Sequence, residues 1–213
     1  KLLEASSNAV NAIIKNIGID TKFKELSELS QEIVCSYEIE IDNQIIGLKP
    51  IDNVCGHNIL PWKIHGGKLL YGVPKPDDNQ IVEENDVIAV EIFVTTGDGT
   101  TILDTNTDNY SHYMLKTMDT TTKIPIFQTK RTNELVSIIK NNFSTLPFCP
   151  RFVNYFNNKN KNFNYKYSLN ELFNSGFLNS YPPLIETNSN AHISQFEHTI
   201  FIGNNKILLS KLS

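Results

Sequence analysis

The sequence predicts a mixed α+β fold in which a helical segment interrupts a series of strands. Two helix-like patterns open the chain, and alternating apolar runs typical of strands continue to about residue 116. Residues 116–180 change to helical patterns, and strand patterns return after Tyr181-Pro182-Pro183. Strands and helices do not alternate regularly and no internal repeat occurs, so a parallel βαβ sheet is not expected.

The first 50 residues predict two helices and a hairpin. The first helix ends before Gly18, and its apolar face consists of Leu2, Ala9, Val10, Ile13 and Ile17. The second helix covers residues 26–36, with an apolar stripe of Leu26, Leu29 and Ile33. Two extended pieces follow and turn at Asp42-Asn43.

Residues 86–176 predict a second hairpin and two further helices. Asp98-Gly99 suits a tight turn between two strand patterns. A helix begins at Thr132 and carries Leu135, Ile138 and Ile139. Ser168 and Glu171 form a capping-box pattern before a short helix that ends at Gly176.

The composition argues against several classes of protein. A net charge of −4 and a pI near 5.7 do not suit a nucleic-acid-binding surface, so no DNA partner is expected. The longest apolar run, Val87–Val94, is too short to cross a bilayer, and we see no secretory signal, so no membrane partner is expected. The three cysteines form no CxxC pair, which predicts neither a zinc knuckle nor a disulfide scaffold and favours the cytoplasm.

Two glutamates lie inside strand-like apolar runs, Glu91 in VIAVEIFV and Glu197 in ISQFEHTIFI. Burying an ionised carboxylate costs several kcal/mol unless a cation or strong donors meet it. A structural ion pair, or a solvated strand face, is the simplest explanation of one such residue. Basic residues are scarce near both runs, so a second glutamate of this kind favours a functional site.

His57 and His65 lie eight residues apart in CGHNILPWKIHGG, an even spacing that two residues on one strand face would share. A hydrogen-bonded structural role is the common explanation of a single histidine. With Glu91 and Glu197, His57 would form an imidazole and carboxylate set that suits Mn, Fe, Co or Zn in a hydrolytic site. HExxH, GxSxG and P-loop motifs are absent, and nothing around Cys55 supports a Cys–His nucleophile.

Six motifs, in their order and spacing, resemble type 2 methionine aminopeptidases: GHNILPWKIHGGK, VIAVEIFVTTGDG, YSHYM, TLPFCPRF, SYPPL and QFEHTI. The resemblance runs from about Leu2 to the end of the chain. It implies the pita-bread (creatinase/aminopeptidase) fold, in which two α+β halves surround a dinuclear metal site. Residues 1–213 would be the second half, the C-terminal portion of the peptidase domain. Residues 116–180 would be the inserted helical, winged-helix-like subdomain of type 2 enzymes.

The resemblance also implies roles for individual residues. Three match metal ligands of the family, the last being the ligand that bridges two metal ions: His57, Glu91 and Glu197. His65 matches a histidine that contacts the substrate near the scissile amide, and His112 matches a pocket histidine. With Glu91 as proton acceptor, these two form the expected catalytic set. Three more match the lining of the pocket for the methionine side chain, although core packing would also explain each of them: Ile64, Tyr181 and Leu184.

The implied activity is the metal-dependent removal of the N-terminal methionine from nascent proteins, by a hydroxide that bridges two divalent ions (Co, Mn, Fe or Zn). Nascent polypeptide N-termini would be the partners, with association to the ribosome as an option, and the compartment would be the cytoplasm. The family's other two ligands are aspartates on an earlier hairpin, and neither Asp20 nor Asp42 aligns with them. These 213 residues alone are therefore expected to be inactive.

Two rival classes stay open. A non-catalytic pita-bread homologue that binds protein or RNA would lose metal ligands, whereas His57, Glu91 and Glu197 are all kept. The metal content of the full-length protein would separate this class. A prolidase would share the fold, but the helical insertion and YSHYM argue against it. Assays with Met-Ala and X-Pro peptides would distinguish the two peptidases.

Overall fold

The computed structural model describes residues 1–106, 110–116, 127, 129–156 and 165–210. The chain forms two compact units. The first comprises Lys1–Ile102 and Leu184–Ser213, and the second comprises Leu103–Pro183. The expected inserted segment, residues 116–180, lies within the second unit, although its parts 117–126, 128 and 157–164 are outside the described residues.

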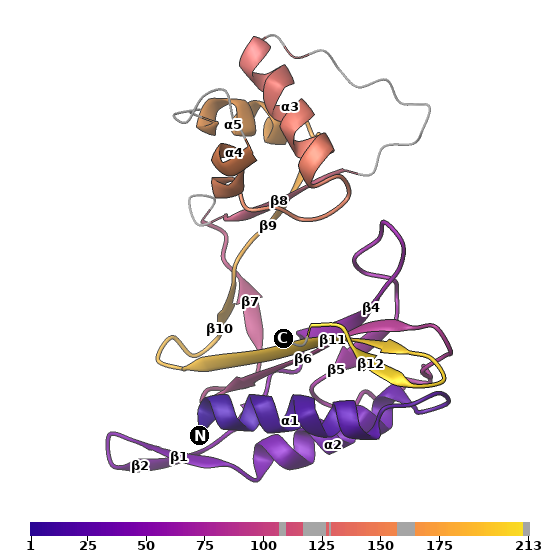
Figure 1. The fold of residues 1–213 in the computed structure, drawn as a ribbon. Coiled ribbons are helices and arrows are strands. Elements are labelled where there is room, and N and C mark those ends of the chain that lie inside the picture. The colour runs from indigo at the N-terminus through magenta and orange to yellow at the C-terminus, as the bar shows by residue number, and fades with distance from the viewer. Residues whose placement is uncertain (107–109, 117–126, 128, 157–164, 211–213) are drawn as a thin grey trace. The chain divides into compact units, whose positions relative to one another are not determined.

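The first unit is built on a six-stranded antiparallel sheet with the order β12-β11-β6-β4-β5, in which β3 also pairs with β6. Its strands are β3 (Lys49–Pro50), β4 (Cys55–Ile59), β5 (Leu69–Tyr71), β6 (Val87–Thr95), β11 (Ile193–Ile202) and β12 (Lys206–Leu208). The two long strands, β6 and β11, lie side by side at its centre (Figure 1).

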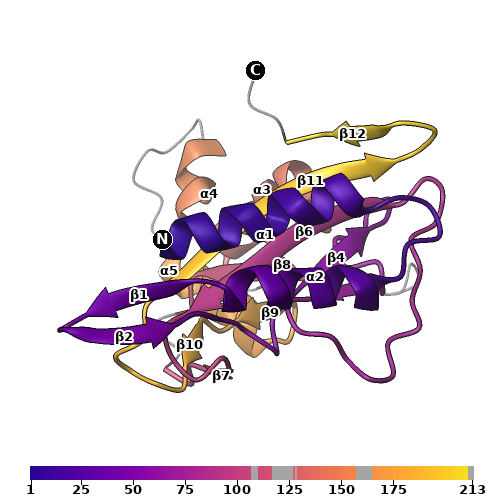
Figure 2. The same ribbon diagram turned by 90° about the horizontal axis from the view of Figure 1, so that it is seen from below.

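Two helices, α1 (Leu2–Asn16) and α2 (Phe23–Cys35), cover one face of this sheet (Figures 1 and 2). The first helix buries Ala5, Ser6, Ala9, Val10 and Ile13. The even-numbered apolar residues of β6, from Ile88 to Val94, are in the same core. Because side chains alternate across a strand, the odd-numbered residues of β6 point to the face without helices.

The second helix differs from its sequence pattern. It begins at Phe23, three residues before the expected start, and Phe23, Leu26 and Val34 are buried. Leu29 and Ile33, expected in the apolar stripe, are only half-buried. The buried face is displaced from the expected stripe, and it includes Ser27 and Ser30. The Ser27 hydroxyl is satisfied because it donates to the Phe23 carbonyl at 3.1 Å.

The hairpin at Asp42-Asn43 is confirmed. It joins β1 (Glu38–Ile41) to β2 (Gln44–Gly47), and both turn residues have positive φ, 51° and 61°. Such values are typical of the two-residue turns that match the twist of a hairpin.

The hairpin expected at Asp98-Gly99 is wrong. Strand β7 (Thr101–Leu103) pairs with β10 (Leu184–Glu186) and not with β6. The buried Glu186 carboxylate accepts a hydrogen bond from the Gly99 N–H at 2.9 Å, and a Cβ at Gly97 would lie 2.6 Å from that carboxylate. The glycine-rich segment therefore wraps around a side chain from a distant strand.

The second unit pairs β8 (His112–Leu115) with β9 (Leu178–Tyr181) and packs them with α3 (Lys130–Asn142), α4 (Arg151–Phe156) and α5 (Lys166–Asn174). The cap of α3 is Thr129, whose side chain accepts from the Thr132 N–H, so Thr132 is inside the helix. Ser168 is likewise inside α5, and Glu171 accepts from the Thr132 hydroxyl. The expected capping box is therefore wrong, while Gly176 ends α5 with φ 72°.

Among the described residues, no helix is both long and apolar enough to cross a membrane. The three cysteines are free thiols.

Candidate functional site

The face of the first sheet that lacks helices carries both glutamates of the apolar runs. In the antiparallel pairing of β6 with β11, Glu91 lies directly opposite Glu197. The Glu91 side chain is 13% exposed, whereas Glu197 is exposed, which matches the solvated strand face that its sequence pattern left open. Like charges directly opposite each other destabilise a sheet, so the pairing needs compensation.

Gln195 provides part of this compensation, and the sequence did not single it out. It lies two residues before Glu197 and therefore on the same face of β11. Its side-chain amide donates to Glu91 Oε2 at 3.0 Å and to Glu197 Oε2 at 3.4 Å. Burial and then the Glu197 charge raise the pKa of Glu91 to about 7, and the hydrogen bond from Gln195 lowers it only in part.

His57 joins this face from the neighbouring strand, β4. It is paired with Ala89, is 9% exposed, and has its Nε2 atom 3.7 Å from Glu91 Oε1. The preceding residue must be small, because a Cβ on Gly56 would lie 2.4 Å from the Ala89 carbonyl oxygen. The Gly-His pair therefore brings the imidazole close to the carboxylate of β6.

His65 lies in the loop after β4 and not on a strand, so the expectation of a shared strand face is wrong. The loop nevertheless returns it to His57, with ring centroids 4.4 Å apart and ring planes at 77°. Burial and then the His57 charge lower the pKa of His65. Ile64 is half-buried beside it, whereas Leu184 is 47% exposed in β10, outside the six-stranded sheet.

His112 and Tyr181 belong to the second unit and face each other across β8 and β9. The His112 Nδ1 atom is 2.9 Å from the Ser111 hydroxyl, and the Tyr181 hydroxyl donates to Met114 Sδ at 3.3 Å. The structure thus brings these two expected substrate-contacting residues together as one cross-strand pair.

Cys55, at the start of β4, is an unsuitable nucleophile. Burial and then the Glu91 charge raise the pKa of its thiol, which Lys75 only partly offsets. Catalytic cysteines require the opposite, a thiolate stabilised by positive charge.

The chemistry of the donors suits a divalent cation, since His57, Glu91 and Glu197 offer one imidazole and two carboxylates. Burial and then the Glu197 charge raise the pKa of Glu91, and a cation beside the two carboxylates would favour the ionised form. Within the described residues, however, no three His, Cys, Asp or Glu side chains are close enough to hold one ion. The face therefore offers suitable ligands without a preformed three-ligand cage.

Two curated proteins similar to this chain are named methionine aminopeptidase 2-2 and methionine aminopeptidase 2. The chain is 40% identical to methionine aminopeptidase 2-2 of Chaetomium globosum over 201 residues, which are 94% of this chain and 43% of that protein. It is 36% identical to methionine aminopeptidase 2 of Komagataella phaffii, over 96% of this chain and 44% of that protein. No family model matches the chain.

Two solved structures share the fold at low sequence identity. A thermophilic Arx1 superposes with a TM-score of 0.65 and 15% identity, over 97% of this chain and 56% of that one. The methionine aminopeptidase of Thermotoga maritima superposes with a TM-score of 0.53 and 14% identity, over 99% of this chain and 51% of that one.

The chain therefore has the α+β pita-bread fold of the methionine aminopeptidases. Over the residues matched, it belongs by sequence to the type 2 methionine aminopeptidases, and it spans less than half the length of the curated relatives named above.

Proposed function

We propose that the protein removes the N-terminal methionine from nascent polypeptides in a metal-dependent reaction. The observation that carries this proposal is the cluster on the sheet face opposite helices α1 and α2. There Glu91 and Glu197 are paired across two strands, and His57 approaches Glu91. The identity of 36–40% to type 2 methionine aminopeptidases over 94–96% of the chain supports the same reaction. The shared fold alone would not define an activity.

We further propose that His57, Glu91 and Glu197 supply ligands to a pair of divalent ions, with Co, Mn, Fe and Zn as candidates. Imidazole and carboxylate ligands suit these metals better than calcium or a thiolate-bound zinc. When bound, such ions polarise a carbonyl oxygen and lower the pKa of a coordinated water to near neutrality.

The remaining chemistry belongs to the side chains of this chain. Glu91 accepts a proton at its carboxylate and returns it to the leaving amine, a task that favours a pKa near the working pH. His65, which lies against His57, donates to the substrate carbonyl, where negative charge develops in the transition state. His112 is the second histidine to which we assign a contact with the peptide.

The side chain of the substrate methionine would be recognised by apolar surface. Each of the three residues proposed for this role has apolar surface: Ile64 and Tyr181 are half-buried and Leu184 is exposed. A small apolar pocket favours an unbranched thioether over a charged side chain. Nascent chains leaving the ribosome in the cytoplasm are the substrates that fit this specificity.

Methionine release from a Met-Ala-Ser peptide by the full-length protein tests the proposal. Release should require Mn or Co and should stop when a chelator is added. The protein should not cleave an X-Pro peptide. Cleavage of X-Pro peptides would indicate a prolidase instead. A full-length protein that binds no divalent metal and releases no methionine would favour the non-catalytic homologue that binds protein or RNA.

A further inference from the structure

The loop that carries His65 is closed at its base by one residue, Asn58. Residues 60–68 join β4 to β5, and Asn58 is only 4% exposed at the start of this loop. Its N–H donates to the Lys68 carbonyl at 3.1 Å and its carbonyl accepts from the Gly66 N–H at 2.7 Å. Its side-chain Oδ1 accepts from the Lys68 N–H at 2.9 Å. Asn58, which precedes the loop, thus binds the two residues Gly66 and Lys68 that follow His65.

Gly66 packs directly against the Asn58 amide. A Cβ at Gly66 would lie 2.3 Å from Asn58 Oδ1 and 2.6 Å from its Cγ. The end of a free side chain could move away, but this one is buried and bonded to the Lys68 N–H. Any side chain at residue 66 must therefore break that hydrogen bond or displace the loop.

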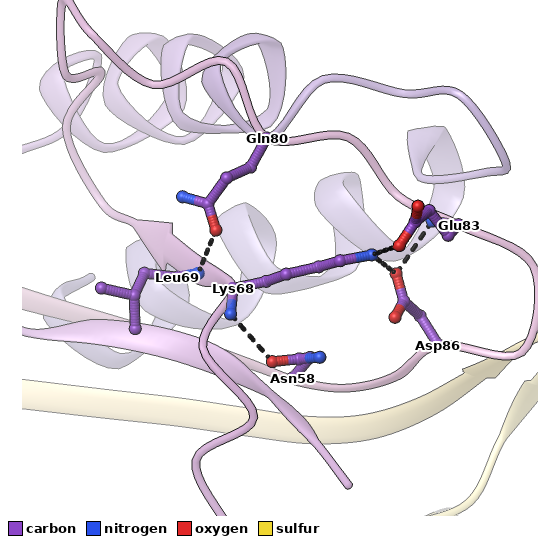
Figure 3. A network of polar contacts seen from close by, with 6 residues as sticks. All are labelled: Asn58, Lys68, Leu69, Gln80, Glu83 and Asp86. Carbon is purple, nitrogen blue, oxygen red and sulfur yellow. Dashed lines mark hydrogen bonds and ion pairs between the residues drawn. The ribbon is translucent and has the colours of Figure 1, made fainter.

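The returning end of the loop is anchored a second time through the Lys68 side chain. Its Nζ atom is 2.6 Å from Glu83 Oε2 and 2.6 Å from Asp86 Oδ2 (Figure 3). Lys68 is 20% and Asp86 10% exposed, so the second ion pair is largely shielded from solvent. The next N–H, that of Leu69, donates to the Gln80 side chain at 3.1 Å.

Asn58 directly follows His57, and Gly66 directly follows His65. The contact between Asn58 and Gly66 therefore links the two histidines through the backbone. We infer that Asn58 and Lys68 are positioning residues that hold the His65 imidazole against that of His57. The two rings lie 4.4 Å apart as a result. An effect on kcat/KM rests on the proposed function, whereas the contact between the two rings does not.

A double-substitution cycle at residues 58 and 66 tests this inference in the full-length protein. The variants are Gly66→Ala, Asn58→Ala and the two combined. Gly47→Ala is the matched control, because a Cβ there meets no atom within 4 Å. Two readouts are taken: the through-space contact between the His57 and His65 ring protons, measured by NMR without added metal, and kcat/KM for Met-Ala-Ser. Urea unfolding shows that each variant is folded.

Gly66→Ala should abolish the ring contact and lower kcat/KM by roughly 10²-fold, the effect expected when a catalytic group moves by about 1 Å. Asn58→Ala removes the three atoms nearest to the added methyl group, so the double variant should match Asn58→Ala within about twofold, a strong departure from additivity. Gly47→Ala should leave both readouts unchanged.

Two results would overturn the inference: a ring contact that survives Gly66→Ala, or effects of the two substitutions that simply multiply. If Gly66→Ala does not fold, Asn58→Ala and Lys68→Met decide the matter, since both should weaken the ring contact in a folded protein. If the unmodified protein releases no methionine, the proposed function fails, and the NMR contact still tests the positioning role.

Discussion

Replacing Glu91 by glutamine should stabilise the metal-free protein at alkaline pH and not at acid pH. Burial and the facing Glu197 raise the pKa of Glu91 from 4.5 to about 7. Each unit of pKa corresponds to about 1.4 kcal/mol, so ionising Glu91 in the folded state costs about 3 kcal/mol relative to the unfolded chain. Solvent screens this cost little, because the side chain is 13% exposed.

The sign of the effect follows from the order in which the two states lose the proton. The unfolded chain releases it near pH 4.5 and the folded chain near pH 7. The cost of ionising Glu91 is therefore absent below pH 4.5, grows between pH 4.5 and about 7, and is complete above about pH 7. Glutamine cannot ionise, and its amide oxygen can still accept from Gln195. Glu91→Gln should gain up to about 3 kcal/mol at pH 8 and nothing at pH 4.5.

Urea unfolding at pH 4.5, 6 and 8, after dialysis against a chelator, measures this difference. Glu28→Gln, at an exposed position of α2, controls for the loss of one negative charge. Equal free energies of unfolding for Glu91→Gln and the unmodified protein at pH 8 would refute the reasoning. Added Mn should make the unmodified protein more stable than Glu91→Gln. A ligand that binds only the folded state stabilises it, and the unmodified protein keeps the Glu91 carboxylate as a ligand for Mn.

Three further predictions concern the proposed reaction. Glu197→Ala should lose bound metal and nearly all methionine release while unfolding normally, since Glu197 is exposed; full activity with metal bound would contradict the expectation that Glu197 bridges two metal ions. His65→Ala should keep its metal, measured by elemental analysis, while kcat/KM falls by roughly 10²-fold; loss of metal would mean that His57 and His65 have each other's roles. Residues 1–213 alone should bind Mn or Co weakly by calorimetry and release no methionine from Met-Ala-Ser, because their described part gathers no three ligands; chelator-sensitive turnover by this chain would contradict that expectation.

Local patterns were sufficient wherever neighbours in sequence decide the structure. The first helix and its buried face follow from apolar spacing, and Gly18 lies just beyond it. Asp42-Asn43 forms the expected turn because both residues tolerate positive φ. The mixed α+β class follows from the same local patterns.

Local patterns failed where a distant residue determines the outcome. Asp98-Gly99 has the composition of a hairpin turn, but Glu186, 87 residues away from Gly99, binds that segment. Ser168 and Glu171 have capping-box spacing, but Glu171 instead accepts from Thr132 on another helix. In both cases a hydrogen bond between groups far apart in sequence accompanies the departure from the local pattern.

The functional residues divide in the same way. Gln195 could have been found from the sequence, because a residue two positions before Glu197 on a strand must share its face. Its bond to Glu91 could not, because that bond depends on the register that places Glu197 opposite Glu91. Asn58 gave no signal at all, since its role arises only when the loop closes and returns Gly66 to it. Candidate metal ligands are recognisable by residue type, whereas the amides of Gln195 and Asn58 make contacts that depend on position alone.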